Sequence, residues 1–161
     1  PRDSIRRQRQ MCIRDSHHTA PVNDLYALHE ALVMLQEEGL EASHARHRHN
    51  HLALVAGLEA MGLAMAVEPQ YRLPQLNSVL IPEGVDEAAV RSALLNEYNL
   101  EIGAGLGALA GKTWRIGLMG FASNEKNVLL CLTALEAVLG RQGFAMPAGA
   151  GLTAAKELFG G

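Results

Sequence analysis

The sequence has few cysteines, few lysines and no long apolar run, and each shortage excludes a class of protein. Two cysteines, Cys12 and Cys131, are too few for a disulfide framework and indicate a reducing compartment. Because no run of about 18 apolar residues occurs, we expect no membrane-spanning helix. None of the three lysines has neighbours typical of Schiff-base chemistry. These lysines are Lys112, Lys126 and Lys156.

Basic residues are also scarce once the N-terminal segment is set aside. Residues 1–16 hold five arginines and two aspartates, so the remaining sequence has nine basic and fifteen acidic side chains. This acidic body argues against nucleic acid as a partner. The basic segment could be a nucleic-acid arm, a transit peptide or foreign sequence. The string RQRQMCIRDS resembles translated sequencing-adaptor sequence. We therefore interpret residues 1–16 as non-native and expect the natural sequence to begin near His17.

The spacing of apolar residues predicts two long helices followed by a small α+β layer. The helices are expected from about Thr19 to Gly39 and from Glu41 to Met61. Short strands are predicted at 63–67, 78–81 and 100–102, with a helix capped by Asp86 between the last two. Ser123 is expected to cap a final helix. Its apolar positions repeat at heptad-like intervals at Val128, Leu132, Leu135 and Leu139.

The predicted fold class is therefore α+β, with a small mixed or antiparallel sheet covered by helices on one face. We divide the chain into a helical segment, 17–62, and a small C-terminal domain, 63–144. The glycine- and alanine-rich tail, 145–161, is predicted to be flexible.

The most informative segment, residues 103–120, runs a glycine-rich loop into a β-type strand that carries one arginine. Period-two alternation gives this strand two different faces. One face carries Thr113, Arg115, Gly117 and Met119, and the other carries Trp114, Ile116 and Leu118. Arg115 could thus bind a carboxylate or phosphate through two parallel hydrogen bonds. The alternative is an ion pair with a neighbouring carboxylate such as Glu101.

Two phosphate-loop patterns in this segment fail on their context. Residues 105–110 fit a loose dinucleotide-binding pattern, but a strand follows where that pattern needs a helix. Residues 111–113 look like the end of a P-loop, but Leu106 stands where the first glycine is required. Neither pattern therefore predicts a phosphate site.

Histidines form a second group of candidates. His44, His47, His49 and His51 lie in the second predicted helix at spacings that could place two imidazoles on one metal. No carboxylate or cysteine ligand accompanies them, so we interpret them as a solvated helix face and expect no metal site. His18 and Thr19 precede the first predicted helix, where a hydroxyl and backbone donors suit an anion or simply cap the helix.

Three stretches of the sequence together resemble one family. They are HHTAPVNDLYALHEAL, YRLPQLNSVLIPEGVD and EIGAGLGALAGKTWRIGLMG, which begin at His17, Tyr71 and Glu101. Over roughly residues 17–141 they are similar to the C-terminal part of class V, fold type I aminotransferases of the alanine/serine–glyoxylate group. The resemblance implies a two-domain homodimer that uses pyridoxal 5′-phosphate. It further implies that the whole protein transfers an amino group from alanine or serine to glyoxylate and so forms glycine, a step of glycine biosynthesis.

The resemblance also implies roles for particular residues. Arg115 matches the arginine that binds the substrate α-carboxylate. Thr19, with His18 beside it, matches the segment that reaches the cofactor phosphate of the other subunit. The family has a tyrosine where this chain has Ser16. None of the three lysines matches the Schiff-base lysine, which lies upstream of the matched part in this family, so we expect this chain alone to be inactive.

Two other functions stay open at this point. The chain could be a stand-alone α+β module that senses a small carboxylate through Arg115, or a metal-binding module built on the histidine helix. A cytoplasmic location is expected, with an organelle as the alternative.

Overall fold

The computed structural model describes residues 20–160. These fall into two units, one ending at Ser43 and the other beginning at His44. The first unit contains helix α2 (Val22–Glu38), which ends where Gly39 adopts a φ of 84° and donates its N–H to the Leu35 carbonyl oxygen. Helix α3 (Leu40–Ala60) starts at the end of this unit and continues into the next. Both long helices thus lie where the sequence predicts them.

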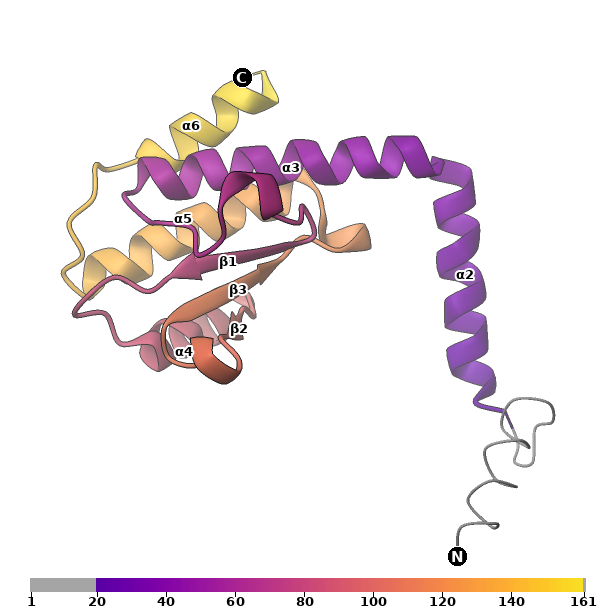
Figure 1. Ribbon diagram of the computed structural model, residues 1–161, viewed down its shortest axis with the longest axis horizontal. Coiled ribbons are helices and arrows are strands. Elements are labelled where there is room, and N and C mark those ends of the chain that lie inside the picture. Colours follow the sequence, from indigo (N-terminus) through magenta and orange to yellow (C-terminus); the bar gives the residue numbers. More distant parts are fainter. Residues whose placement is uncertain (1–19, 161) are drawn as a thin grey trace, which may run out of the picture. The chain divides into compact units, whose positions relative to one another are not determined.

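The second unit has a three-stranded sheet, with helices and short 3₁₀ turns before, between and after the strands (Figure 1). The strands are β1 (Leu76–Leu80), β2 (Gly103–Ala104) and β3 (Thr113–Gly117). The helices after α3 are α4 (Glu87–Tyr98), α5 (Glu125–Arg141) and α6 (Ala150–Phe159). The 3₁₀ turns are η1 (Pro69–Tyr71), η2 (Gly107–Leu109) and η3 (Gly120–Ala122). The predicted α+β class is confirmed.

The third strand in sequence is the central strand of the sheet. The order is β1-β3-β2, and both pairings are antiparallel. The strand predicted at 100–102 lies slightly later, at β2. The strand predicted at 63–67 is reduced to one bridge, between Met65 and Val79. Because β3 is paired on both sides, its position is the most constrained in the sheet.

The hydrophobic core lies on one face of this sheet. Trp114, Ile116 and Leu118 are buried there, together with Val79 of β1. The core also contains residues from three helices: Leu54, Leu58 and Met61 of α3, Val90 and Leu94 of α4, and Val128, Leu132, Leu135 and Leu139 of α5. The predicted apolar face of the strand and the predicted apolar stripe of α5 are therefore confirmed.

Side-chain caps start two of these helices. Asp86 accepts a hydrogen bond from the Ala89 amide at 3.0 Å and caps α4, as predicted. The cap of α5 is one residue later than expected. Asn124, not Ser123, accepts the Asn127 amide, at 2.9 Å. The Ser123 side chain is instead buried, where its hydroxyl oxygen lies 3.3 Å from Asn50 Nδ2.

The predicted flexible tail contains helix α6, so that prediction is wrong for residues 150–159. Its glycine and alanine residues serve close packing: Gly151 and Ala155 are buried. A Cβ atom on Gly57 of α3 would lie 2.8 Å from the Gly151 carbonyl oxygen, and the Leu132 side chain would also be too close, so the close approach of α3 and α6 requires glycine here. Glu136 holds the start of α6, because its Oε1 accepts the Gly149 amide at 2.7 Å.

No helix within the described residues is long and apolar enough to cross a membrane.

Burial of Cys131 in α5 predicts a pH dependence of stability. Burial raises the pKa of this thiol from its usual 9.0 to about 12. Above pH 9 the thiol ionises in the unfolded chain but stays neutral in the folded one, so its contribution to stability is lost as pH rises toward 12. Relative to Cys131→Ala, the chain should lose about 1.4 kcal/mol of unfolding free energy for each pH unit in this window. Urea unfolding at pH 8 and pH 10.5 measures it, and a stability difference independent of pH would contradict the prediction.

Candidate functional site

Arg115 lies at the middle of the central strand, on the face opposite the core. Along β3, buried and more exposed side chains alternate as predicted, except that Thr113 is also buried. Two residues stand directly opposite Arg115, Ser78 on β1 and Gly103 on β2. Opposite residues of an antiparallel pair point to the same face, so Ser78 shares a surface with the arginine, a neighbour that the sequence alone did not indicate.

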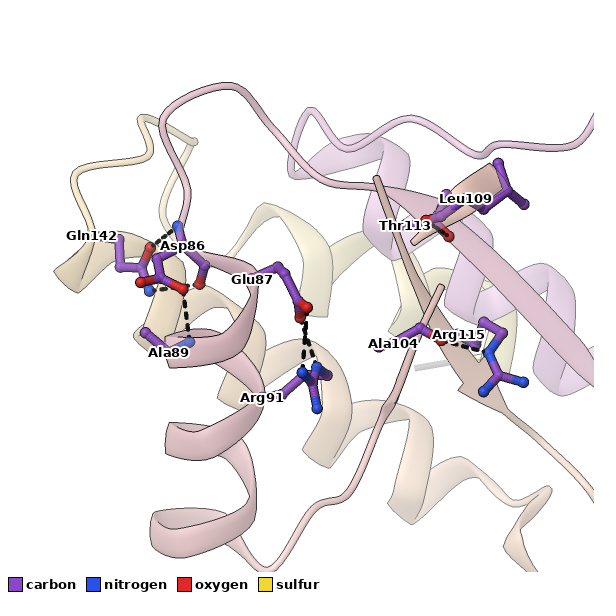
Figure 2. Close-up of polar contacts among 9 residues, drawn as sticks. All are labelled: Asp86, Glu87, Ala89, Arg91, Ala104, Leu109, Thr113, Arg115 and Gln142. Atoms are coloured by element: carbon purple, nitrogen blue, oxygen red, sulfur yellow. Dashed lines mark hydrogen bonds and ion pairs between the residues drawn. The ribbon is translucent and has the colours of Figure 1, made fainter. Parts of the chain in front are cut away.

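The guanidinium of Arg115 is fixed by one backbone hydrogen bond. Its Nε donates to the Ala104 carbonyl oxygen at 2.7 Å, as the dashed line in Figure 2 shows. The group passes closely over Gly103, because a Cβ atom at that position would lie 3.1 Å from an Arg115 terminal nitrogen. The strand β2 therefore contributes a small surface and a carbonyl acceptor that together orient the guanidinium.

The terminal nitrogens of Arg115 are left for another partner. Among residues 20–160 its side chain forms no ion pair, and Ala104 is its single hydrogen-bond acceptor. The alternative prediction, an ion pair between Arg115 and Glu101, is therefore wrong. The residue is half-buried. With Nε occupied, its two terminal nitrogens can bind a planar carboxylate end-on through two parallel hydrogen bonds.

The loop before β3 is closed by its own backbone. Gly105 donates its amide to the Thr113 carbonyl oxygen at 2.8 Å, and Lys112 donates to the Leu109 carbonyl oxygen at 3.0 Å. Thr113 is buried beneath this loop, with its hydroxyl 3.5 Å from the Leu109 carbonyl oxygen (Figure 2). The loop is thus a tight cover that fixes where β3 begins, and not an open phosphate cradle.

Two histidines of α3 are buried, which differs from the predicted solvated face. His47 and His51 are each 7% exposed, whereas His44 and His49 are exposed. A sequence signal for this was present. The spacing of His47 and His51 continues, one turn after another, into the apolar stripe of the same helix at Leu54, Leu58 and Met61.

The four histidines do not converge on a metal position. In the part of the chain that the structure describes, no group of three or more histidine, cysteine, aspartate or glutamate side chains could hold an ion. The buried pair instead bonds to neighbouring strands and turns. His51 Nδ1 lies 2.6 Å from Asn77 Oδ1, and His47 Nε2 accepts the Gly120 amide at 3.0 Å.

The lysines of the chain are not placed to form a Schiff base with a pyridoxal cofactor. All three lysines are exposed: Lys112 precedes β3, Lys126 lies in the first turn of α5 and Lys156 in the last turn of α6. A Schiff-base lysine would need a desolvated or positively charged setting, which none of these positions offers. The residues predicted to reach the cofactor phosphate, His18 and Thr19, lie outside the described residues. Among residues 20–160, Arg115 is therefore a candidate for binding a substrate acid, and no lysine is a candidate for the Schiff base.

The chain is similar in sequence to known glyoxylate aminotransferases. No protein-family model matches the chain. It is 44% identical over 146 residues to the (S)-ureidoglycine–glyoxylate transaminase of Bacillus subtilis, covering 91% of this chain and 35% of that protein. It is 43% identical over 124 residues to the alanine–glyoxylate aminotransferase of Callithrix jacchus, covering 76% of this chain and 30% of that protein.

A solved structure agrees with the sequence comparison. The crystal structure of the ureidoglycine–glyoxylate aminotransferase from Bacillus subtilis superposes with a TM-score of 0.87 at 43% identity, over 92% of this chain and 38% of that one. The chain thus spans about a third of the length of the curated relatives it matches.

The closed loop before β3 predicts that Gly105→Ala destabilises the fold. A Cβ atom at Gly105 would overlap the Leu109 carbonyl oxygen and lie 2.6 Å from Thr113 Oγ1. Backbone cannot move aside as a flexible side chain does, so we expect a loss of about 1–3 kcal/mol in the free energy of unfolding. Urea denaturation of the chain measures it.

Gly140→Ala is the matched control, because a Cβ atom there meets nothing within 4 Å and alanine favours a helix. Its stability should be unchanged or slightly higher. Equal stability of Gly105→Ala and the unmodified chain would show that the loop is more open than described.

Proposed function

The chain is homologous to the C-terminal part of class V glyoxylate aminotransferases, and from this we propose that the whole protein transfers an amino group to glyoxylate to form glycine. Glyoxylate is the substrate that the names of both curated relatives share, while their amino donors differ. For this protein we propose a small 2-amino acid as donor, with alanine or serine as the first candidates. The proposed setting is a homodimer in the cytoplasm.

The observation that carries the proposal is that the Arg115 side chain is anchored at Nε while its terminal nitrogens face no carboxylate of the described residues. Its Nε is anchored on Ala104, and no carboxylate of the described residues pairs with its terminal nitrogens. Leaving a half-buried guanidinium fork without a partner is favourable only if water or a bound acid completes it. A small carboxylate from outside the chain supplies the missing acceptors.

One arginine in this role serves both directions of a transamination. The amino donor and the 2-oxo acceptor each carry a carboxylate beside the carbon that exchanges nitrogen. Binding that carboxylate end-on fixes two atoms of either substrate and so restricts the orientation of the reacting carbon. Ser78, opposite Arg115 on the same face, is placed to contact the bound acid from the side.

We propose pyridoxal 5′-phosphate as the cofactor of the whole protein. When bound, this group supplies the electron sink that amino-group transfer requires. The roles of Thr19 and His18 toward its phosphate rest on the family resemblance alone. The lysine that such chemistry needs is expected in the part of the relatives that this chain does not match.

The first prediction from this proposal concerns Arg115→Lys in the full-length protein. Lysine cannot keep the bond to Ala104 and also offer two parallel donors to a carboxylate. Loss of a charge-assisted pair worth about 1.5–3 kcal/mol should raise KM for the amino donor and for glyoxylate by about 10- to 100-fold. Steady-state kinetics measure both constants, and the cofactor absorbance should stay near normal.

Arg91→Lys is the matched control, because Arg91 pairs with Glu87 on the surface of α4 at 2.7 Å and lies in no candidate site. Its KM values should equal those of the unmodified protein. If both substrates kept their affinity in Arg115→Lys, Arg115 would not be the carboxylate-binding residue.

The second prediction concerns the 161-residue chain alone. Because none of its three lysines is placed for Schiff-base chemistry, it should form no glycine from alanine or serine and glyoxylate, even with added pyridoxal 5′-phosphate. Chromatographic detection of glycine measures this. Turnover above the rate of free cofactor would mean that one of these lysines is used after all.

A further inference from the structure

Two buried histidines of α3, one helical turn apart, bond to the segments on either side of the strand that carries Arg115. His47 and His51 are four residues apart, so their side chains lie on the same face of the helix. Buried imidazoles need hydrogen-bond partners, and each of these rings has one. The partners belong to β1 and to the turn after β3, which are the immediate neighbours of the carboxylate-binding strand.

His51 acts on β3 through Asn77. The His51 Nδ1 atom is 2.6 Å from Asn77 Oδ1, and Asn77 is 1% exposed. The Asn77 amide nitrogen donates to the Ile116 carbonyl oxygen at 3.4 Å and to the Pro74 carbonyl oxygen at 3.5 Å. Asn77 Oδ1 can only accept, so His51 carries its proton on Nδ1. The chain of bonds ends on the residue next to Arg115.

His47 acts on the segment where the chain leaves β3. The Gly120 amide donates to His47 Nε2 at 3.0 Å, so that nitrogen must be unprotonated. The neighbouring Arg46 donates to the carbonyl oxygens of Gly120 at 2.8 Å and of Ser123 at 2.7 Å. Side chains of α3 thus donate hydrogen bonds to backbone carbonyl oxygens at η3 and also accept one from a backbone amide there.

We propose that His51 and His47 are positioning residues for the carboxylate site. His51 holds the Ile116 carbonyl of β3 through Asn77, and His47 holds the Gly120 amide of η3 just after the strand, so together they fix the strand position from which Arg115 reaches its acid. This inference rests on the proposed function of Arg115. It also assigns a role to the histidine cluster: the buried pair positions the strand, and the exposed His44 takes no part.

The experiment compares variants of the full-length protein. His51→Leu leaves Asn77 Oδ1 buried without a donor, whereas the double variant His51→Leu with Asn77→Leu removes both polar partners. KM for the amino donor and for glyoxylate, kcat, and the urea midpoint are measured for each. The matched control is His44→Leu, an exposed histidine of the same helix.

We expect His51→Leu to raise both KM values about tenfold or more with a smaller change in kcat, because a small displacement of Arg115 weakens the end-on pair. The double variant should regain part of the lost urea midpoint, since the buried Asn77 Oδ1 that lacked a donor is gone, although the Ile116 carbonyl oxygen loses its bond from Asn77. Its KM values should stay raised, because the link from His51 through Asn77 to the Ile116 carbonyl is now removed entirely. The His44→Leu values should be unchanged.

A recovery of KM together with stability in the double variant would overturn the proposal, since the pair would then be merely structural. Unchanged KM in His51→Leu would overturn it as well. Arg115→Lys is measured in parallel: a loss of affinity there without any effect at His51 would refute the positioning role and leave the proposed function standing. No loss in Arg115→Lys would refute the proposed function first.

A second comparison covers the case in which the leucine variants do not fold. The side-chain carbonyl of His47→Gln can still accept the Gly120 amide, so its KM values should lie near normal, whereas His47→Leu should raise them. Nitrogen-15 NMR of the unmodified chain should show His51 protonated at Nδ1 and His47 unprotonated at Nε2. The opposite protonation of either ring would overturn the proposal.

Discussion

The structure depends on the alternation of side chains along one short strand. Trp114 and Ile116 point into the core and are almost fully buried, so Arg115 between them must point to the other face. A slip of one residue would bury the guanidinium and expose the indole, at a cost that no nearby contact could offset. Core packing and the proposed carboxylate site are thus two consequences of the same register.

The central position of β3 makes that register hard to change. Pairing with β1 on one side and β2 on the other leaves the strand no free edge in the sheet. The two-residue strand β2 is short, yet it provides the carbonyl that accepts Arg115 Nε and the glycine over which the guanidinium lies. Gly103 and Ala104 therefore serve the arginine directly, whereas the residues that resemble a phosphate loop, 105–113, form a loop closed by its own backbone bonds.

Much of this arrangement could be predicted from the sequence, because it follows from periodicity. The apolar face of β3, the stripe of α5 and the cap at Asp86 depend only on residues close in sequence. The Arg115–Ala104 bond could not be predicted, because it depends on the pairing register of two strands. Helix α6 was missed for another reason: a segment rich in glycine and alanine reads as loose, although small residues are what two closely crossing helix backbones require.

The histidines show how a chemical motif can hide a packing pattern. As metal ligands, the four histidines form no group that could hold an ion among the described residues. As positions on a helix, His47 and His51 extend the buried stripe of α3. Burial of an imidazole is tolerated only where each ring nitrogen that meets protein finds a matching donor or acceptor. Such matching also specifies geometry, because a hydrogen bond defines direction as well as distance, whereas apolar contacts alone permit sliding. The bond from His51 to Asn77, which itself bonds to the Ile116 carbonyl, and the bond between His47 and the Gly120 amide therefore constrain the strand beside Arg115 in a way that leucines in place of the histidines would not.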